Sequence, residues 1–128
     1  MNIAVQYSTL IVKDLKESVT FYRDVLGFSE DYHVDLPNGA AITIMKSTGG
    51  AYVELIESSQ YEVGLYSIGT DVDDLDGTID HLEKCGYRTT GPIIPTTVGR
   101  QTFVLDPNGV RICLIEHSSE YKAAHPLN

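Results

Sequence analysis

The stretch VKDLKESVTFYRDVLGF, residues 12–28, decides the fold because the chain contains a second version of it. That version is VDDLDGTIDHLEKCGY, residues 72–87, which aligns with the first at an offset of 60. The second stretch is one residue shorter, so the offset after it is 59. At this offset ELIE (54–57) aligns with CLIE (113–116). A constant spacing between matching segments indicates an internal repeat of roughly 60 residues.

Each half of the repeat predicts a β-α-β-β-β module. In the first module a strand over 4–12 precedes a helix that begins at Asp14 and ends at Gly27. Asp14 with Glu17 three positions later is typical of a capping box, and glycine is the common residue just after a helix. The second helix runs from Asp74 to Gly86. The face of the first helix expected to pack on the sheet consists of Leu15, Val19, Tyr22 and Leu26.

Three strands are predicted after each helix, separated by turns rich in glycine and asparagine. The chain of 128 residues is then one α+β domain, with module 1 at about 4–58, module 2 at about 65–117 and a polar tail at 118–128. The tail is expected to be mobile or to form an arm onto a partner subunit. The predicted strands are roughly 28–35, 40–46 and 51–57 in the first module, and roughly 87–94, 100–105 and 110–117 in the second.

Composition excludes several classes of partner. The net charge of −9 and the absence of a basic patch argue against nucleic acid and against an anionic membrane surface. The sequence contains no apolar run long enough to span a membrane and no secretory signal, which predicts a cytoplasmic protein. Cys85 and Cys113 form no CxxC pair and are expected to be reduced thiols.

Alternation along the strands assigns side chains to two faces of the predicted sheet. The face expected to pack against the helices consists of Leu10, Val12, Val53, Leu55, Ile68, Val72, Ile112 and Leu114, with Phe103 and Leu105. The opposite face consists of Tyr7, Thr9, Tyr52, Glu54, Ser67, Gly69, Arg111 and Cys113, with Arg100 and Thr102. This second face is polar and aromatic, and we expect it to line a concave ligand cup.

The repeated module, with the segments TLIVKDLKESVTFYRDVLGF, YVELIE and FVLDPNGVRICLIE, resembles the vicinal oxygen chelate superfamily over residues 4–117. This superfamily includes glyoxalase I, bleomycin-resistance-type binding proteins, fosfomycin-resistance enzymes and extradiol dioxygenases. The resemblance implies two tandem modules in a curved mixed sheet, a ligand cup on its concave face and assembly as a homodimer, with each cup completed across the subunit interface.

The resemblance also locates the positions where metal enzymes of the superfamily carry His and Glu ligands. Those positions hold Tyr7, Glu54, Ser67 and Cys113, so only Glu54 keeps the family's ligand type. A carboxylate with a thiol and two hydroxyls suits neither an imidazole- and oxygen-binding ion nor a thiolate site. We therefore expect no metal and no other cofactor. A fosfomycin-type or dioxygenase-type activity is disfavoured because both need a metal centre.

Other chemically notable residues favour ordinary structural roles. The four histidines, at positions 33, 81, 117 and 125, lie away from the family's ligand positions. Cys113 lacks an adjacent base in sequence, which favours packing or cup lining over nucleophilic chemistry. The acidic run DVDDLD (71–76) lacks the spacing of a calcium loop and is explained by a strand end followed by a helix N-terminus.

The leading functional interpretation is a metal-free small-molecule-binding protein that resembles the bleomycin-resistance branch. The alternative is an enzyme that resembles glyoxalase I or an epimerase, with Glu54 as base or as a ligand of a residual site for Ni, Zn, Mn or Fe. A third interpretation is a collapsed cup in a protein whose role is oligomerisation. The residues predicted to line the cup are Tyr7, Tyr52, Glu54, Ser67, Arg100, Arg111 and Cys113.

Overall fold

The computed structural model describes residues 1–124 of the chain. The chain divides into two compact units, one comprising Gln6–Ser67 and the other Met1–Val5 together with the chain from Ile68 onward. Each unit combines one packed helix with mixed β-structure, as two β-α-β-β-β modules predict.

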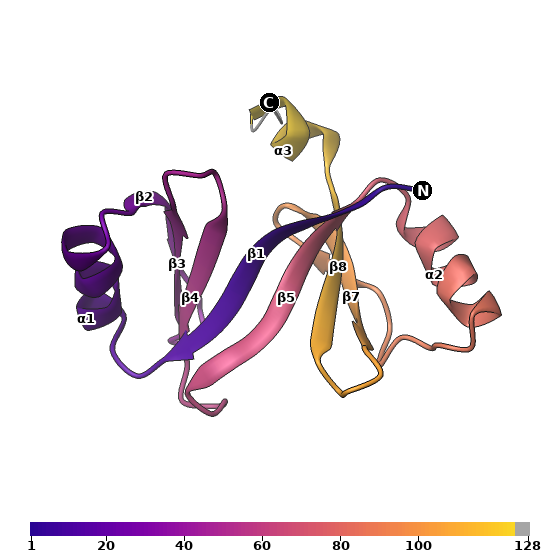
Figure 1. Cartoon of the computed structure of the whole chain (residues 1–128), viewed down its shortest axis with the longest axis horizontal. Coiled ribbons are helices and arrows are strands. Elements are labelled where there is room, and N and C mark those ends of the chain that lie inside the picture. The colour runs from indigo at the N-terminus through magenta and orange to yellow at the C-terminus, as the bar shows by residue number, and fades with distance from the viewer. Residues whose placement is uncertain (125–128) are drawn as a thin grey trace. The chain divides into compact units, whose positions relative to one another are not determined.

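The first unit contains a four-stranded arrangement in the order β2-β3-β4-β1, covered on one face by a helix (Figure 1). Strand β1 pairs in parallel with β4, whereas β3 pairs antiparallel with both β2 and β4. The sheet is therefore mixed, as predicted. Its elements are β1 (Ile3–Val12) from Gln6 onward, α1 (Leu15–Thr20), the π-helical turn η1 (Phe21–Val25), β2 (Ser29–Asp35), β3 (Ala41–Lys46) and β4 (Tyr52–Glu57).

The second unit repeats this plan in the order β5-β8-β7-β6. Strand β5 pairs in parallel with β8, and β7 pairs antiparallel with both β8 and β6. Its elements are β5 (Gly64–Val72) from Ile68 onward, α2 (Leu75–Lys84), β6 (Ile94–Thr96), β7 (Gly99–Leu105), β8 (Arg111–His117) and α3 (Ser119–Ala124).

The helix ends form as their capping residues predict. The Asp14 side chain accepts a hydrogen bond from the Glu17 amide, and the Asp74 side chain accepts one from the Gly77 amide. Both aspartates have extended backbones, which is the conformation of an N-cap residue. After the first helix, Gly27 has a φ of 79°, a left-handed conformation that glycine adopts without a steric penalty.

The first helix differs from the second by one wide turn. Residues 21–25 form the π-helical turn η1, whereas α2 is α-helical throughout. A π-turn holds one residue more than an α-turn, which accounts for the single-residue difference between the two helix sequences. The extra residue rotates the next part of the helix, so Leu26, predicted to face the sheet, is 48% exposed. Phe28 packs against the core of this unit instead.

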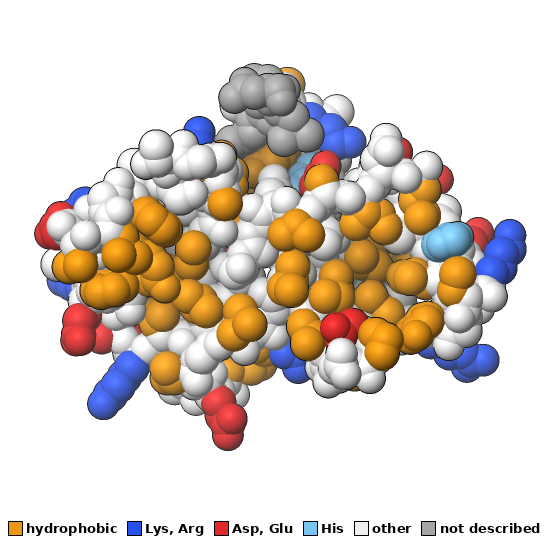
Figure 2. Space-filling view, in the orientation of Figure 1, with side chains coloured by type: hydrophobic (Ala, Val, Ile, Leu, Met, Phe, Trp, Pro, Cys, Tyr) orange, Lys and Arg blue, Asp and Glu red, His pale blue; other side chains and the backbone are white. Residues whose placement is uncertain are grey.

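Each unit has its own hydrophobic core between helix and strands. In the first, Leu15 and Val19 of α1 cluster with Met45 and Leu55 of the sheet. Figure 2 shows further hydrophobic side chains on the surface over α1 and the neighbouring strands. The second core is a cluster of Val72, Leu75, Val104 and Leu114, flanked by Ile79, Leu82, Ile93 and Ile112. Burying this apolar area is the main stabilising term for each unit.

Two predicted segments differ from the structure. The strand predicted over 87–94 is absent before Ile94, and only β6 is formed. Gly91 and Pro92, two residue types that are depleted in strands, lie in the part that forms no strand. The polar tail contains the short helix α3, and the part of the predicted tail at 125–128 lies outside the described residues.

Candidate functional site

Glu54 lies on β4, with its side chain on the face of the sheet opposite α1. Its neighbours along the strand, Val53 and Leu55, both pack in the helix-side core, so alternation turns Glu54 to the other face. Thr9 is the residue directly beside Glu54 on β1, and its hydroxyl donates a 2.8 Å hydrogen bond to Glu54 Oε1. Thr9 itself is buried. Adjacent strands thus create a fixed hydroxyl and carboxyl pair.

The surroundings of Glu54 favour its neutral form. Burial raises the pKa of the Glu54 carboxyl above its usual value of 4.5, and the Thr9 hydroxyl offsets part of that rise by donating to the carboxylate. An uncharged carboxyl group can donate a hydrogen bond as well as accept one. A carboxylate with a raised pKa is also a stronger proton acceptor, so the site can support either ligand binding or acid–base chemistry.

Two tyrosines lie on the same face as Glu54. Tyr7 on β1 is the direct neighbour of Tyr52 on β4, and both are half-buried. The ammonium group of Lys46, on β3, lies 5.8 Å from the centroid of the Tyr52 ring. The first unit therefore brings Tyr7, Tyr52 and Glu54 onto one surface. The predicted Ser67, in β5 at the end of this unit, is 3% exposed.

The predicted residues of the second unit include Cys113 and Arg111 on β8. Cys113 is 4% exposed, and its backbone carbonyl accepts a 2.8 Å hydrogen bond from the Thr70 hydroxyl. It lies between Ile112 and Leu114, which belong to the helix-side core, and therefore faces away from α2. Arg111 shares that face by alternation and is half-buried.

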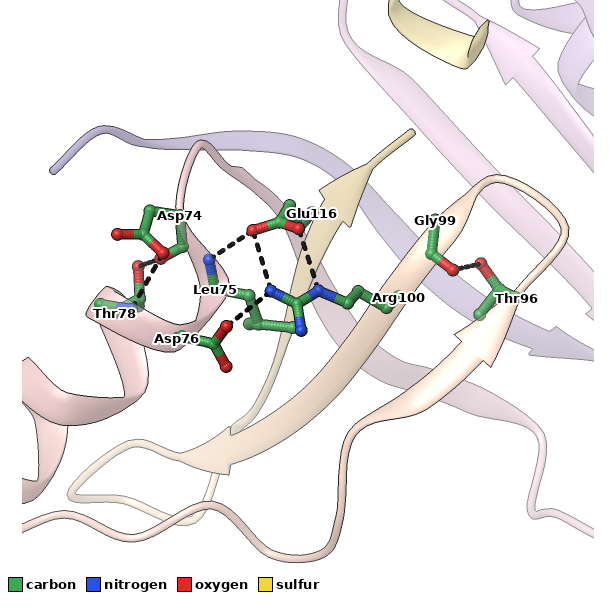
Figure 3. A network of polar contacts seen from close by, with 9 residues as sticks. Asp74, Leu75, Asp76, Thr78, Thr96, Gly99, Arg100 and Glu116 are labelled. Carbon is green, nitrogen blue, oxygen red and sulfur yellow. Dashed lines mark hydrogen bonds and ion pairs between the residues drawn. The ribbon is translucent and has the colours of Figure 1, made fainter. Parts of the chain in front are cut away.

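The predicted placement of Arg100 and Thr102 is wrong. Their neighbour Val104 packs in the core beneath α2, so all three side chains lie on the helix-covered face. Arg100 donates from Nε to Glu116 Oε1 at 2.9 Å and from Nη2 to Asp76 Oδ2 at 2.9 Å (Figure 3).

Phe103 and Leu105, predicted to pack against the helix, lie on the other face of β7. The cross-strand register sets the assignment because Thr102 pairs with Leu114 and Phe103 pairs with Cys113. Leu105 is 42% exposed. Both rows of this strand contain hydrophobic residues, so composition alone assigned the wrong row.

A buried cluster around His117 was not predicted from the sequence. His117 is 6% exposed, and its Nδ1 lies 2.5 Å from Asp71 Oδ1. The ring of Tyr121, from α3, stacks on the His117 ring with centroids 4.3 Å apart. Alternation could have found this cluster, because His117 lies four residues after Cys113 and thus on the same face. The structural role expected for His117 agrees with these contacts.

The other histidines and the acidic run also have structural partners. His33 contacts Thr43 and Asp35, and His81 lies 3.7 Å from the Cys85 sulfur. His125 lies outside the described residues. In the acidic run, Asp71 contacts His117 and Asp76 contacts Arg100. Asp73 accepts a hydrogen bond from the Asn2 amide, and Asp74 accepts one from the Gly77 amide. Each of these four aspartates therefore has a partner within the chain.

The donor groups at the family's metal positions do not fit a divalent ion. They comprise one carboxylate, a phenol, an aliphatic hydroxyl and a thiol, from Tyr7, Glu54, Ser67 and Cys113. Glu54 Oε1 is already engaged by Thr9. Among residues 1–124, no three His, Cys, Asp or Glu side chains lie close enough together to hold a metal. Divalent transition ions are usually held by three or four such groups.

No helix in the described part of the chain is both long and apolar enough to cross a membrane.

Comparison with known proteins places these observations in a family. The sequence profile of the Glyoxalase/Bleomycin resistance protein/Dioxygenase superfamily matches residues 4–114. A probable lactoylglutathione lyase from Synechocystis sp. is 32% identical over 127 residues, covering 89% of this chain and 95% of the relative.

Two solved structures share the fold with a TM-score of 0.80 each. The hypothetical protein BH1468 from Bacillus halodurans is 18% identical, covering 93% of this chain and 97% of its own. A methylmalonyl-CoA epimerase from Mycobacterium tuberculosis is 21% identical, with coverages of 94% and 91%. The likeness confirms the predicted glyoxalase-type fold. The chain belongs to the Glyoxalase/Bleomycin resistance protein/Dioxygenase superfamily.

Proposed function

We propose that this protein binds a small molecule on the sheet face that carries Glu54, and that it does so without a bound metal. The observation that carries the proposal is the hydrogen bond from Thr9 to Glu54, the only residue that keeps the family's ligand type. The hydrogen bond holds the carboxyl group in one orientation and leaves its second oxygen, Oε2, available to a ligand. A carboxyl group positioned in this way suits a polar anchor for a small molecule.

The same face offers the other contacts that a small-molecule site needs. Tyr7 and Tyr52 provide apolar rings with a polar edge, and Lys46 beside Tyr52 provides a positive charge. Flat aromatic or anionic molecules match this combination. Ser67, the last residue of the same unit, completes the proposed lining. The proposal includes three further features: a binding protein similar to the bleomycin-resistance branch, assembly as a homodimer and a cytoplasmic location.

A second candidate is a lyase or epimerase in which Glu54 moves a proton. The raised pKa of the Glu54 carboxyl favours this candidate, because a general base works best when its pKa approaches the operating pH. The names of the similar proteins, a probable lactoylglutathione lyase and a methylmalonyl-CoA epimerase, indicate two substrates to test. Either reaction would need donors other than a metal to stabilise negative charge on the substrate.

The test compares binding and turnover with and without metal. S-lactoylglutathione, methylmalonyl-CoA and a panel of small aromatic acids are titrated into EDTA-treated protein and into protein supplied with Ni²⁺, Zn²⁺, Mn²⁺ or Fe²⁺. The proposal predicts that at least one compound binds equally well in both preparations and that Glu54→Gln weakens it. Glu17→Gln, at an exposed helix position, is the matched control.

The outcomes separate the two candidates. Binding without turnover supports the binding protein, whereas turnover in EDTA that disappears in Glu54→Gln supports the metal-independent enzyme. Turnover only in metal-supplied protein would overturn both.

A further inference from the structure

The same helix-capping contact occurs in both units. In the first, Glu57 Oε1 accepts a 2.8 Å hydrogen bond from the Leu15 amide at the start of α1. In the second, Glu116 Oε2 accepts a 2.8 Å hydrogen bond from the Leu75 amide at the start of α2. Each carboxylate stands at the end of the last strand of its unit. Glu57 and Glu116 therefore occupy corresponding positions, on the helix-covered face of each sheet.

In the second unit this carboxylate also binds a guanidinium group. Arg100 is the direct cross-strand neighbour of Glu116 and donates to both of its carboxylate oxygens, at 2.9 and 3.3 Å. Figure 3 shows the guanidinium between Glu116 and Asp76, beside the start of α2. Arg100 holds the pKa of the Glu116 carboxyl below its usual range. The negative charge is thus neutralised within the chain.

The first unit differs at the position where this cation would stand. The direct cross-strand neighbour of Glu57 is Ala41, the position that corresponds to Arg100. The position that corresponds to Asp76 holds Lys16, and within the described residues no ion pair joins Lys16 to Glu57. Glu57 is half-buried and keeps its contact to Leu15. A carboxylate in this setting is without the charge partner that its counterpart has.

A groove of about 660 Å³ lies where the guanidinium would be. Glu57 and Ala41 line it, with α1 on one side and β2 on the other. It contains three further carboxylates, of Asp14, Glu30 and Asp35, against the cations Lys16 and Arg23, and the imidazole of His33, which also lines the groove, contacts Asp35 at 3.1 Å. Arg23 is already paired with Asp24 and Glu30, at 2.8 and 3.8 Å. The field in the groove therefore favours a positive ligand.

We propose that this groove binds a small organic cation, a guanidinium or primary amine, with Glu57 taking the role that Glu116 takes toward Arg100. A carboxylate accepts a guanidinium through two parallel hydrogen bonds. Arg100 and Glu116 form such a pair in the second unit, so a guanidinium fits between the start of α2 and the end of β8 there. The site lies on the helix-covered face, opposite Glu54. It is independent of the proposed function, so either can fail alone.

Agmatine, which carries both a guanidinium and an amine, is the probe. Its titration is followed by calorimetry and by the NMR shift of the Leu15 amide, which reports directly on Glu57. We expect saturable binding in the wild type and at least about tenfold weaker binding in Glu57→Gln, because the variant lacks the charged acceptor for the guanidinium. Glu83→Gln, an exposed carboxylate on α2, is the matched control and should bind as the wild type does.

A second variant tests the site without removing the Leu15 cap. Ala41→Arg places a guanidinium opposite Glu57, as Arg100 stands opposite Glu116, and should abolish agmatine binding while raising the melting temperature. Ala51→Arg adds the same charge at an exposed turn and should do neither. The proposal would be overturned if the wild-type protein did not bind agmatine. It would also be overturned if Glu57→Gln and Ala41→Arg both bound agmatine as tightly as the wild type does.

Discussion

Thr9 and Glu54 are direct neighbours on the parallel strands β1 and β4, and the Thr9 hydroxyl donates to the Glu54 carboxyl at 2.8 Å. Parallel pairing places the two side chains on the same face, and burial of Thr9 fixes the donor in position. The pair holds the one carboxylate of the family's ligand set in a defined orientation. The protonation of Glu54 can therefore be tested by replacing Thr9 and Glu54 in turn.

Removing the Thr9 hydroxyl should raise the pKa of Glu54 further. The hydroxyl stabilises the charged carboxylate, so Thr9→Val leaves burial unopposed. The measurement is an NMR titration of the Glu54 side-chain carbonyl carbon in both proteins. Thr20→Val, at an exposed position of α1, is the control and should leave the titration unchanged. A lower pKa in Thr9→Val would contradict the assigned role of this hydrogen bond.

Glu54 should make the protein less stable as the pH rises. Its folded-state pKa lies above the unfolded value, so its favourable contribution is complete below about 4.5 and is lost as the pH rises through the folded pKa. Glu54→Gln cannot ionise and should escape this loss. The difference in unfolding free energy between Glu54→Gln and wild type should therefore favour the variant more at pH 7 than at pH 4. A difference that is constant across this range would show that Glu54 titrates normally.

Arg100 should stabilise the second unit through the start of α2. Replacing it with methionine keeps much of the side-chain volume and removes the ion pairs to Glu116 and Asp76. Because the Arg100 side chain is 35% exposed, solvent screens these pairs, and we expect a cost of about 1 kcal/mol in urea unfolding. The equivalent change at the exposed Arg23 should cost less. Equal costs would place Arg100 among ordinary surface residues.

The Arg100 contribution should also depend on pH in a defined direction. Arg100, and secondarily the Leu75 amide, lower the pKa of Glu116, so this carboxyl stabilises the fold above its unfolded pKa. That stability is lost as the pH falls through the folded pKa. The Arg100→Met cost should therefore shrink in acid. A cost that grows on acidification would contradict the ion pair.

Asp71→Asn should destabilise the cluster under α3. The His117 side chain is 4% exposed, and it would lose a charged acceptor that it contacts at 2.5 Å. Leaving a buried donor poorly satisfied costs about 1–3 kcal/mol. Urea unfolding measures this loss, with Asp31→Asn on the exposed part of β2 as control. Wild-type stability in Asp71→Asn would show that the contact contributes nothing.

Local signals in the sequence predicted most of the secondary structure. Asp14 and Asp74 begin the helices, and Gly27 follows the first, because capping depends on a few adjacent residues. The β-branched runs that became β1 and β4 are equally local. The glycine and asparagine turns end the strands close to the predicted residues.

The errors arose where distant contacts decide. The face of Arg100 depends on the register between β7 and β8, which its own alternating strand cannot reveal. Leu26 turned outward because of a π-turn, although the one-residue difference between the two helix sequences was visible. The His117 cluster needs α3 to fold back, and a six-residue helix is held by such contacts more than by its own propensity.

Glu54 is proposed to contact its ligand without a bound metal, and the metal content of the purified protein tests this most directly. This measurement is combined with a thermal-shift titration of Ni²⁺, Zn²⁺, Mn²⁺ and Fe²⁺ into wild type and Glu54→Ala. A metal-free site predicts substoichiometric metal and no stabilisation that depends on Glu54. Stoichiometric metal, or a melting temperature that rises with metal concentration in the wild type and not in Glu54→Ala, would contradict it.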